Sequence, residues 1–113
     1  MKEGDVGLAA LPQADQQRKK RPVVILREMP FHDDFLVCGV STHLKQQISS
    51  LDELISPDDP DFKSSGLLTQ SLIRLGFLAV IGGKEIAGAI GSISRERHRR
   101  LLGTLSDYLR TDP

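Results

Sequence analysis

Two short polar segments of this 113-residue chain carry side-chain types suited to phosphate chemistry. The first is the basic run Arg18-Lys19-Lys20-Arg21, which is followed by Pro22. A guanidinium presents a rigid fork of donors that matches phosphate oxygens, so this run is a candidate anion-binding loop. A solvated basic turn is the structural alternative. The second segment is Ser41-Thr42-His43, which either caps the end of a strand or belongs to a composite site with the basic run.

A hairpin would bring these two segments together. Residues 23–26 are apolar on both faces, which is typical of a central strand. Residues 29–34 favour a turn, and residues 35–40 form the apolar partner strand. If the two strands pair through this turn, their far ends meet. The pattern therefore predicts that Arg21 lies beside Ser41-Thr42.

Besides the hairpin, the apolar patterns predict further short strands and a proline-containing loop. Strands are expected at residues 6–10, 47–51, 67–75 and 77–81, a loop at 56–61, and a short strand or irregular chain at 86–93.

The chain ends in an amphipathic helix pattern. Its apolar residues recur at helical spacing on one stripe, with the arginines of residues 95–100 mostly off it. They are Leu101, Leu102, Leu105, Tyr108 and Leu109. Ser94 is a candidate N-cap. Several short strands followed by one helix predict a single mainly-β domain over residues 1–113, a small barrel or coiled sheet capped by a C-terminal helix.

Charge and composition restrict the function classes. The 15 basic and 15 acidic residues give zero net charge, which argues against a protein that grips nucleic acid with its whole surface. Bases concentrate around Arg21 and acids at residues 52–61, however, so one basic groove is compatible with neutrality. The chain has one cysteine, no signal-peptide-like start and no apolar stretch near the ~20 residues of a membrane span. We expect a cytoplasmic protein.

Most signatures of metal and cofactor chemistry are missing from the sequence. One cysteine and three scattered histidines give no zinc spacing, and neither phosphate-binding glycine motif occurs. The acids at residues 58–61 lack the glycine and closing glutamate of a calcium loop, which favours a solvated acidic loop. No motif places His43 against Ser41, so a nucleophilic triad is not predicted. We expect neither a metal nor a cofactor.

A series of short motifs runs along nearly the whole chain, from Gly4 to about Leu109. Its segments are Gly4-Asp5-Val6, residues 9–12, Gln16-Gln17, residues 21–25, Val40-Ser41-Thr42, residues 59–62, Ser65-Gly66-Leu67, residues 71–75 and residues 90–94. Their order and spacing, together with the terminal helix, resemble the PemK/MazF family, the toxin endoribonucleases of bacterial type II toxin–antitoxin pairs.

The resemblance implies an SH3-like small β-barrel with a C-terminal helix, acting as a homodimer. It implies metal-independent, sequence-specific cleavage of single-stranded RNA, usually mRNA, giving a 2′,3′-cyclic phosphate. It also implies a cognate antitoxin whose acidic tail occupies the RNA groove. The family's arginine corresponds to Arg21 and its catalytic hydroxyl residue to Ser41, with Thr42 adjacent. The residues expected to bind RNA are Gln17, Arg18, Lys19, Lys20, Ser71 and Arg74.

Two departures from the family pattern affect the site. Residues 16–20 are basic and lack the glycines that family members often have there. Some members carry an arginine and an acid where this chain has Thr69 and Ser71. No carboxylate is therefore evident as general base, and the acids of residues 52–61 are candidates only by elimination. For Arg74 a structural ion pair is the alternative.

Two other functions remain open for this fold. A catalytically degenerate member would bind RNA or antitoxin without turnover. A gyrase-poisoning toxin would bind protein through a Trp-Gly-Ile terminus, whereas this chain has no tryptophan and ends Arg110-Thr111-Asp112-Pro113.

Overall fold

The protein is seen here in a computed structural model that describes residues 1–11, 19–31 and 33–112. The strands of the described part are β1 (Asp5–Ala10), β2 (Lys20–Met29), β3 (Asp34–Ser41), β4 (Glu53–Ile55), β5 (Ser71–Gly82) and β6 (Ile86–Ser92). The helical elements are η1 (Leu44–Gln46), α1 (Phe62–Ser65), η2 (Gly83–Glu85) and α2 (Arg95–Arg110). The expected mainly-β fold with a C-terminal helix is confirmed.

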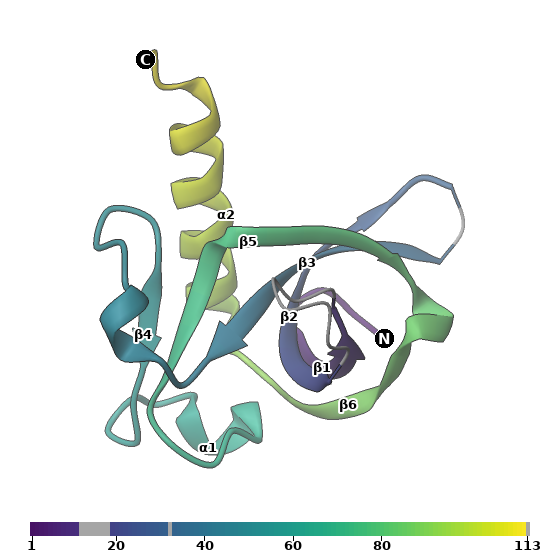
Figure 1. The fold of residues 1–113 in the computed structure, drawn as a ribbon, viewed down its shortest axis with the longest axis horizontal. Helices are drawn as coiled ribbons and strands as arrows, with labels where there is room; N and C mark the ends of the chain where they lie inside the picture. Colours follow the sequence, from purple (N-terminus) through teal and green to yellow (C-terminus); the bar gives the residue numbers. More distant parts are fainter. Residues whose placement is uncertain (12–18, 32, 113) are drawn as a thin grey trace.

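The strands form one antiparallel sheet in the order β4-β5-β3-β2-β1-β6. The sheet curls, with β5 and β6 passing on opposite sides of the β1–β2 pair (Figure 1). In the described residues β4 and β6 are its two edges and do not pair with each other, so the sheet is open and the expected barrel is matched only loosely. Helix α1 lies against β6 so closely that a Cβ at Gly91 would collide with the Ser64 carbonyl.

The predicted central hairpin is confirmed. β2 pairs with β3 in a register that sets Val23 opposite Gly39. Residues 23–26 are completely buried, and alternate residues contribute to two separate apolar clusters on the two faces of the sheet. The connecting turn uses Asp33 at φ 58°, a left-handed conformation that aspartate tolerates better than most residues.

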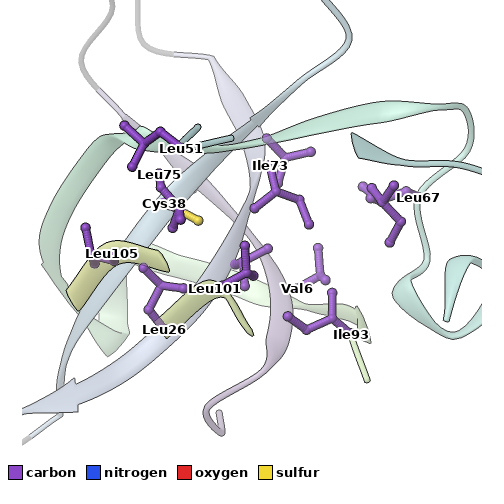
Figure 2. Close-up of a cluster of buried hydrophobic side chains, with 13 residues drawn as sticks. Val6, Leu26, Cys38, Leu51, Leu67, Ile73, Leu75, Ile93, Leu101 and Leu105 are labelled. Carbon is purple, nitrogen blue, oxygen red and sulfur yellow. The ribbon is translucent and has the colours of Figure 1, made fainter. Parts of the chain in front are cut away.

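The larger apolar cluster lies between the sheet and α2 (Figure 2). Leu26 of β2, Cys38 of β3 and Leu101 of α2 meet there with no solvent exposure. Burial raises the pKa of the Cys38 thiol to about 12, so the cysteine stays protonated and packs as a small apolar side chain. This cluster fixes the helix on one face of the hairpin and leaves the ends of β2 and β3 for other contacts.

Two strand predictions are wrong in detail. β5 is one long strand rather than two, because its pairing with β3 skips residues 75–77 instead of ending there. The strand expected at residues 47–51 is absent, and the edge strand is β4 instead. Residues 48–52 form a turn, since the amides of Leu51 and Asp52 both donate to the Ile48 carbonyl. Those backbone groups are therefore not available to a neighbouring strand.

Helix α2 begins where the sequence predicts it. The Ser94 hydroxyl accepts a hydrogen bond from the Arg97 amide at 3.1 Å, which caps the helix. Only the first half of the apolar stripe is covered: Leu101 and Leu105 are buried, whereas Tyr108 and Leu109 are exposed on the half that projects beyond the sheet (Figure 1). Among the described residues, no helix has both the length and the apolar character to cross a membrane.

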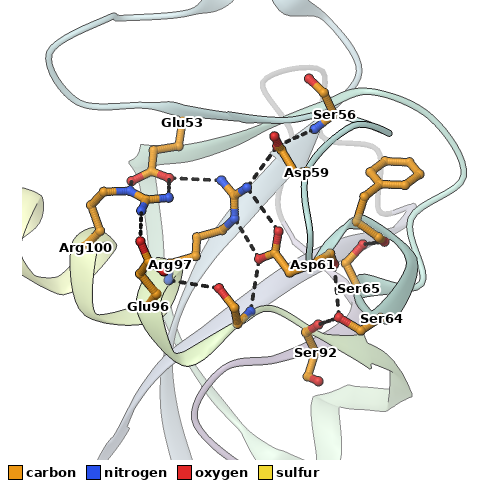
Figure 3. Close-up of polar contacts among 12 residues, drawn as sticks. Glu53, Ser56, Asp59, Asp61, Ser64, Ser65, Ser92, Glu96, Arg97 and Arg100 are labelled. Carbon is orange, nitrogen blue, oxygen red and sulfur yellow. Dashed lines mark hydrogen bonds and ion pairs between the residues drawn. The ribbon is translucent and has the colours of Figure 1, made fainter.

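The guanidinium of Arg97 connects α2 to the segment between β4 and α1. It is 6% exposed and donates to Asp61 at 2.8 Å, and to Glu53 and Asp59 at 3.0 Å each (Figure 3). The expectation of a solvated acidic loop is therefore wrong for Asp59 and Asp61. Sequence spacing gave no sign of this cluster, because its arginine lies more than 30 residues away in the helix.

Pairing inside this cluster outweighs the cost of burial. Burial raises the pKa of the Asp61 carboxyl, but hydrogen bonds from Arg97 and from the Ser94 amide lower it further, to below its ordinary value. Burial likewise lowers the pKa of Arg97, and the surrounding carboxylates raise it above its ordinary value. Both groups are therefore ionised, and the cluster is a partly buried ion pair network.

Candidate functional site

A cleft of about 300 Å³ opens where β2 begins and β3 ends, beside the bend of β5. Its walls combine two arginines, a serine, a histidine and a glutamine with apolar side chains and one glycine. The lining residues are Leu11, Arg21, Gly39, Val40, Ser41, His43, Gln46, Arg74 and Phe77. The cleft therefore offers positive charge and hydrogen-bond donors beside an aromatic surface.

The hairpin register places Arg21 and Ser41 in this cleft. Because Val23 lies opposite Gly39, Arg21 at the start of β2 reaches the same end of the sheet as Ser41 at the end of β3. Both line the cleft, and the predicted juxtaposition of these two residues is confirmed. Thr42, the next residue, is exposed and is not among the lining residues.

Arg74 joins the cleft from β5. The register shift between β3 and β5 pairs Arg74 with Gly39 and leaves residues 75–77 outside the ladder, so that Arg74 and Phe77 both face the cleft. The Arg74 guanidinium carbon lies 5.9 Å from the centre of the Phe77 ring. The Phe77 ring packs over Gly39, where a Cβ would lie in van der Waals contact with the ring at 3.4 Å. The bend that sequence analysis interpreted as a break between strands thus builds one wall of the site.

The Arg74 side chain has an unmet hydrogen-bonding need. Its Nε is buried and has no hydrogen-bond partner among the described residues. The ion pair considered as its structural role is absent in that part of the chain. An unsatisfied buried donor costs about 1–3 kcal/mol, more when charged, so the Arg74 side chain carries an uncompensated cost in this conformation.

The Ser41 hydroxyl is oriented by the chain that follows it. The His43 amide donates to the Ser41 Oγ at 3.0 Å, so the oxygen is engaged as an acceptor and its proton is available to a ligand oxygen. His43 starts η1, and that turn brings Gln46 to the same cleft. Sequence analysis missed Gln46, Leu11 and Phe77 as site residues. The three-residue spacing of His43 and Gln46 was the signal available, but no helical turn was predicted there.

Several residues expected to bind RNA lie outside the cleft. Lys19 and Lys20 are exposed beside Arg21 but do not line it. Ser71 is 3% exposed, its hydroxyl donates to the Thr69 carbonyl at 2.8 Å, and its backbone pairs with Ile55 of β4. Gln17 and Arg18 lie outside the described residues.

The electrostatics of the cleft favour an anion. None of the described residues that line it is acidic. In the described part of the chain, neither Arg21 nor Arg74 forms an ion pair with a carboxylate. Two unneutralised guanidiniums facing one cavity match the charge and geometry of phosphate oxygens.

Comparison with known proteins connects this geometry to a family. A family model described as the PemK-like, MazF-like toxin of type II toxin–antitoxin systems matches residues 2–109. A sequence search of the curated proteins gives no match.

Solved structures share the fold at low sequence identity. The chain superimposes on a Mycobacterium tuberculosis toxin, MazF-mt6, with a TM-score of 0.70 at 18% identity, covering 96% of this chain and 99% of the other. It also resembles a mycobacterial endoribonuclease in complex with its cognate antitoxin, with a TM-score of 0.70 at 16% identity, covering 98% and 97%. A further mycobacterial endoribonuclease has a TM-score of 0.67 at 15% identity, covering 95% and 88%. With a family match over nearly its entire length and the same fold in these structures, the chain belongs to the PemK-like, MazF-like toxins of type II toxin–antitoxin systems.

Proposed function

We propose that this protein is an endoribonuclease toxin that cleaves single-stranded RNA, such as mRNA, without a metal. The observation that carries the proposal is the pair of unneutralised arginines, Arg21 and Arg74, beside the free hydroxyl proton of Ser41. Family membership and the endoribonuclease activity named for two of the similar structures support the same assignment.

RNA brings its own nucleophile to such a cleft. The 2′-hydroxyl attacks the adjacent phosphorus, and the protein need only orient the strand and stabilise developing charge. Arg21 neutralises the negative charge that builds on the phosphate oxygens in the transition state. Ser41 donates to one non-bridging oxygen, and the Arg74 guanidinium, from its side of the cleft, binds another. The products are a 2′,3′-cyclic phosphate and a free 5′-hydroxyl.

Sequence preference would arise from the apolar wall of the cleft. Unstacked bases of single-stranded RNA stack on aromatic rings and guanidinium planes. Phe77 with Arg74 across its face forms such a surface, and the Gln46 amide carries both a donor and an acceptor for a base edge. We infer that Lys19, Lys20 and Thr42, exposed next to the cleft, contact the flanking strand. Ser71 is left out of this set because its hydroxyl is already engaged.

We also propose that residues 1–113 act as a single domain in the cytoplasm, where a cognate antitoxin inhibits it. An acidic antitoxin segment would compete with RNA for Arg21 and Arg74, since both ligands present oxygens with negative charge. One of the similar structures is described as a complex with its antitoxin. Homodimer formation is proposed from the family resemblance, and the exposed Tyr108 and Leu109 of α2 support an association surface there.

The test is cleavage of a long RNA by the purified protein in the presence of EDTA. Cleavage with cyclic-phosphate ends, lost in Arg21→Ala, supports the proposal. Absence of cleavage of any RNA, or full activity of the variant, contradicts it. Tight RNA binding without turnover would identify a degenerate binding member instead.

A further inference from the structure

Attack by a 2′-hydroxyl requires a group that accepts its proton, and the described residues that line the cleft include one side chain suited to this. Arginine stays protonated in proteins, so Arg21 and Arg74 cannot serve. The Ser41 hydroxyl and the Gln46 amide do not titrate near neutral pH, and the other lining residues besides His43 are apolar or glycine. An imidazole is the side chain whose ordinary pKa lies close to neutrality.

The acids considered from the sequence are positioned elsewhere. None of them, Asp52, Glu53, Asp58, Asp59 or Asp61, lines the cleft. Glu53, Asp59 and Asp61 are held by the Arg97 guanidinium, and a carboxylate held in an ion pair is a poor proton acceptor. Within the described residues, elimination therefore leaves the histidine.

The backbone of His43 is fixed while its ring is free. Its amide donates to the Ser41 Oγ at 3.0 Å, and its carbonyl accepts from the Gln46 amide at 3.1 Å. The imidazole has no hydrogen-bond partner among the described side chains and backbone groups, and the residue is exposed. The ring is thus attached to the same short segment as the hydroxyl that would hold the phosphate, with both nitrogens available to a substrate.

We propose that His43 is the proton acceptor for the 2′-hydroxyl of RNA bound in the cleft. This inference rests on the proposed endoribonuclease function. The 2′-oxygen forms its bond to phosphorus as its proton passes to the neutral imidazole, and the bond from phosphorus to the 5′-oxygen breaks. The 5′-oxygen takes a proton from solvent, and the imidazolium returns its proton to solvent after product release. No electrons are exchanged with another reactant.

Among the described residues, the charged groups that line the cleft together with His43 are Arg21 of β2 and Arg74 of β5, and both are cations. In the proposed arrangement these arginines bind the phosphate oxygens, and the imidazole accepts the proton of the ribose 2′-hydroxyl. Lys45, two residues after His43 and within η1, is exposed and does not line the cleft. It therefore offers a matched control on the same turn.

The experiment compares the pH dependence of RNA cleavage by wild type, His43→Gln and Lys45→Gln, with thermal unfolding to verify folding. A base that acts only when neutral gives the wild type an activity that rises with pH on the acidic side. We expect His43→Gln to lower kcat about 100-fold or more, to leave KM nearly unchanged, and to lose the acidic limb. Lys45→Gln should keep the limb, whatever its effect on RNA affinity.

A substrate with sulfur in place of the bridging 5′-oxygen separates base from acid catalysis, because a thiolate leaves without a proton. Continued impairment of His43→Gln on this substrate supports the proposal, and restored activity overturns it. Retention of the acidic limb in His43→Gln also overturns the proposal. Asp15 is an acid in the segment outside the described residues, and loss of the limb in Asp15→Asn would overturn the proposal as well. If the wild type cleaves no RNA, the proposed function itself fails; an active wild type with an unchanged His43→Gln profile refutes only the role of His43.

Discussion

Arginines in two regions of this protein have opposite environments. Arg97 is buried between α2 and the β4–α1 segment, where three carboxylates surround its guanidinium. Arg21 and Arg74 face a cleft that contains no acid among its described lining residues, and in the same part of the chain the Arg74 Nε has no partner. Both regions contribute to the same neutral sequence. The difference shows that Glu53, Asp59 and Asp61 are committed to a structural arginine, whereas the described lining of the cleft offers its arginines no such partner.

The largest expected effect is on catalysis. Arg21→Ala should lower kcat/KM for RNA cleavage by about 1,000-fold, because a guanidinium on a reacting phosphate stabilises transition-state charge. Its thermal unfolding should stay near wild type, since Arg21 is exposed. Steady-state kinetics and calorimetry on the same preparation measure both. If Arg21→Ala instead lowered the free energy of unfolding substantially, its loss of activity would be explained by unfolding, and Arg21 would have a structural role like that of Arg97.

The converse variant tests the structural group. Arg97→Leu should reduce the free energy of unfolding by about 3–5 kcal/mol, because it leaves Asp61 buried without its cation. Denaturant unfolding measures this change. Molecules that remain folded at low temperature should still cleave RNA. A stable but inactive Arg97→Leu protein would show that Arg97 is needed for cleavage rather than for folding, which contradicts the division into a structural arginine and the arginines of the cleft.

A smaller effect is expected at Ser41. Ser41→Ala should lower kcat by about 10–100-fold, because it removes one donor to the phosphate and leaves the His43 amide without its acceptor. Ser41→Thr retains the hydroxyl and should recover much of the activity. Single-turnover cleavage distinguishes the two variants, and equal loss in both would argue that packing rather than the hydroxyl matters.

The Arg97 cluster also predicts a pH dependence of stability. The pKa of Asp61 is lowered in the folded protein, so the unfolded state binds more protons in acid. The stabilisation of the folded state by the ionised Asp61 carboxylate is complete above the unfolded pKa, about 3.9, and is lost as pH falls through the lower folded pKa. Unfolding free energies measured from pH 6 down to pH 2 should decline with a shallower slope in Asp61→Asn. An identical slope would mean that Asp61 is not ionised in the cluster.

The smallest effect serves as a control within the acidic segment. Asp58 is exposed and forms no ion pair in the described part of the chain. Asp58→Asn should change the free energy of unfolding by less than about 0.5 kcal/mol and leave cleavage unaltered. Denaturant unfolding beside Arg97→Leu makes the comparison direct, and a large loss would show that the segment acts through its total charge.

Patterns within single elements were predictable from the sequence. Residues 23–26 indicate a strand buried on both faces because they are apolar at every position, and Ser94 indicates a helix start because its hydroxyl can cap. The placement of Arg21 and Ser41 at the same end of the hairpin followed from hairpin geometry alone. Each of these depends on neighbours along the chain, for which local rules suffice.

Contacts between distant segments were not predictable in this way. Asp61 and Arg97 lie 36 residues apart, and neither residue type announces the other as its partner. Arg74 and Phe77 line the cleft because the β3–β5 register shifts at this point. The apolar periodicity predicted a break between two strands there. The exposure of Tyr108 and Leu109, in the second half of the apolar stripe, was also not predictable, because it depends on how far α2 extends past the sheet.

The central hairpin, the terminal helix and the composition of the basic and acidic segments can all be inferred from the order of residues. Which charges cancel cannot, because that depends on distances between side chains that the chain order does not specify and that the folded protein sets. The acids of β4 and its following loop meet Arg97, and no acid lining the cleft meets Arg21 or Arg74. The neutral total therefore conceals a cleft with uncompensated positive charge.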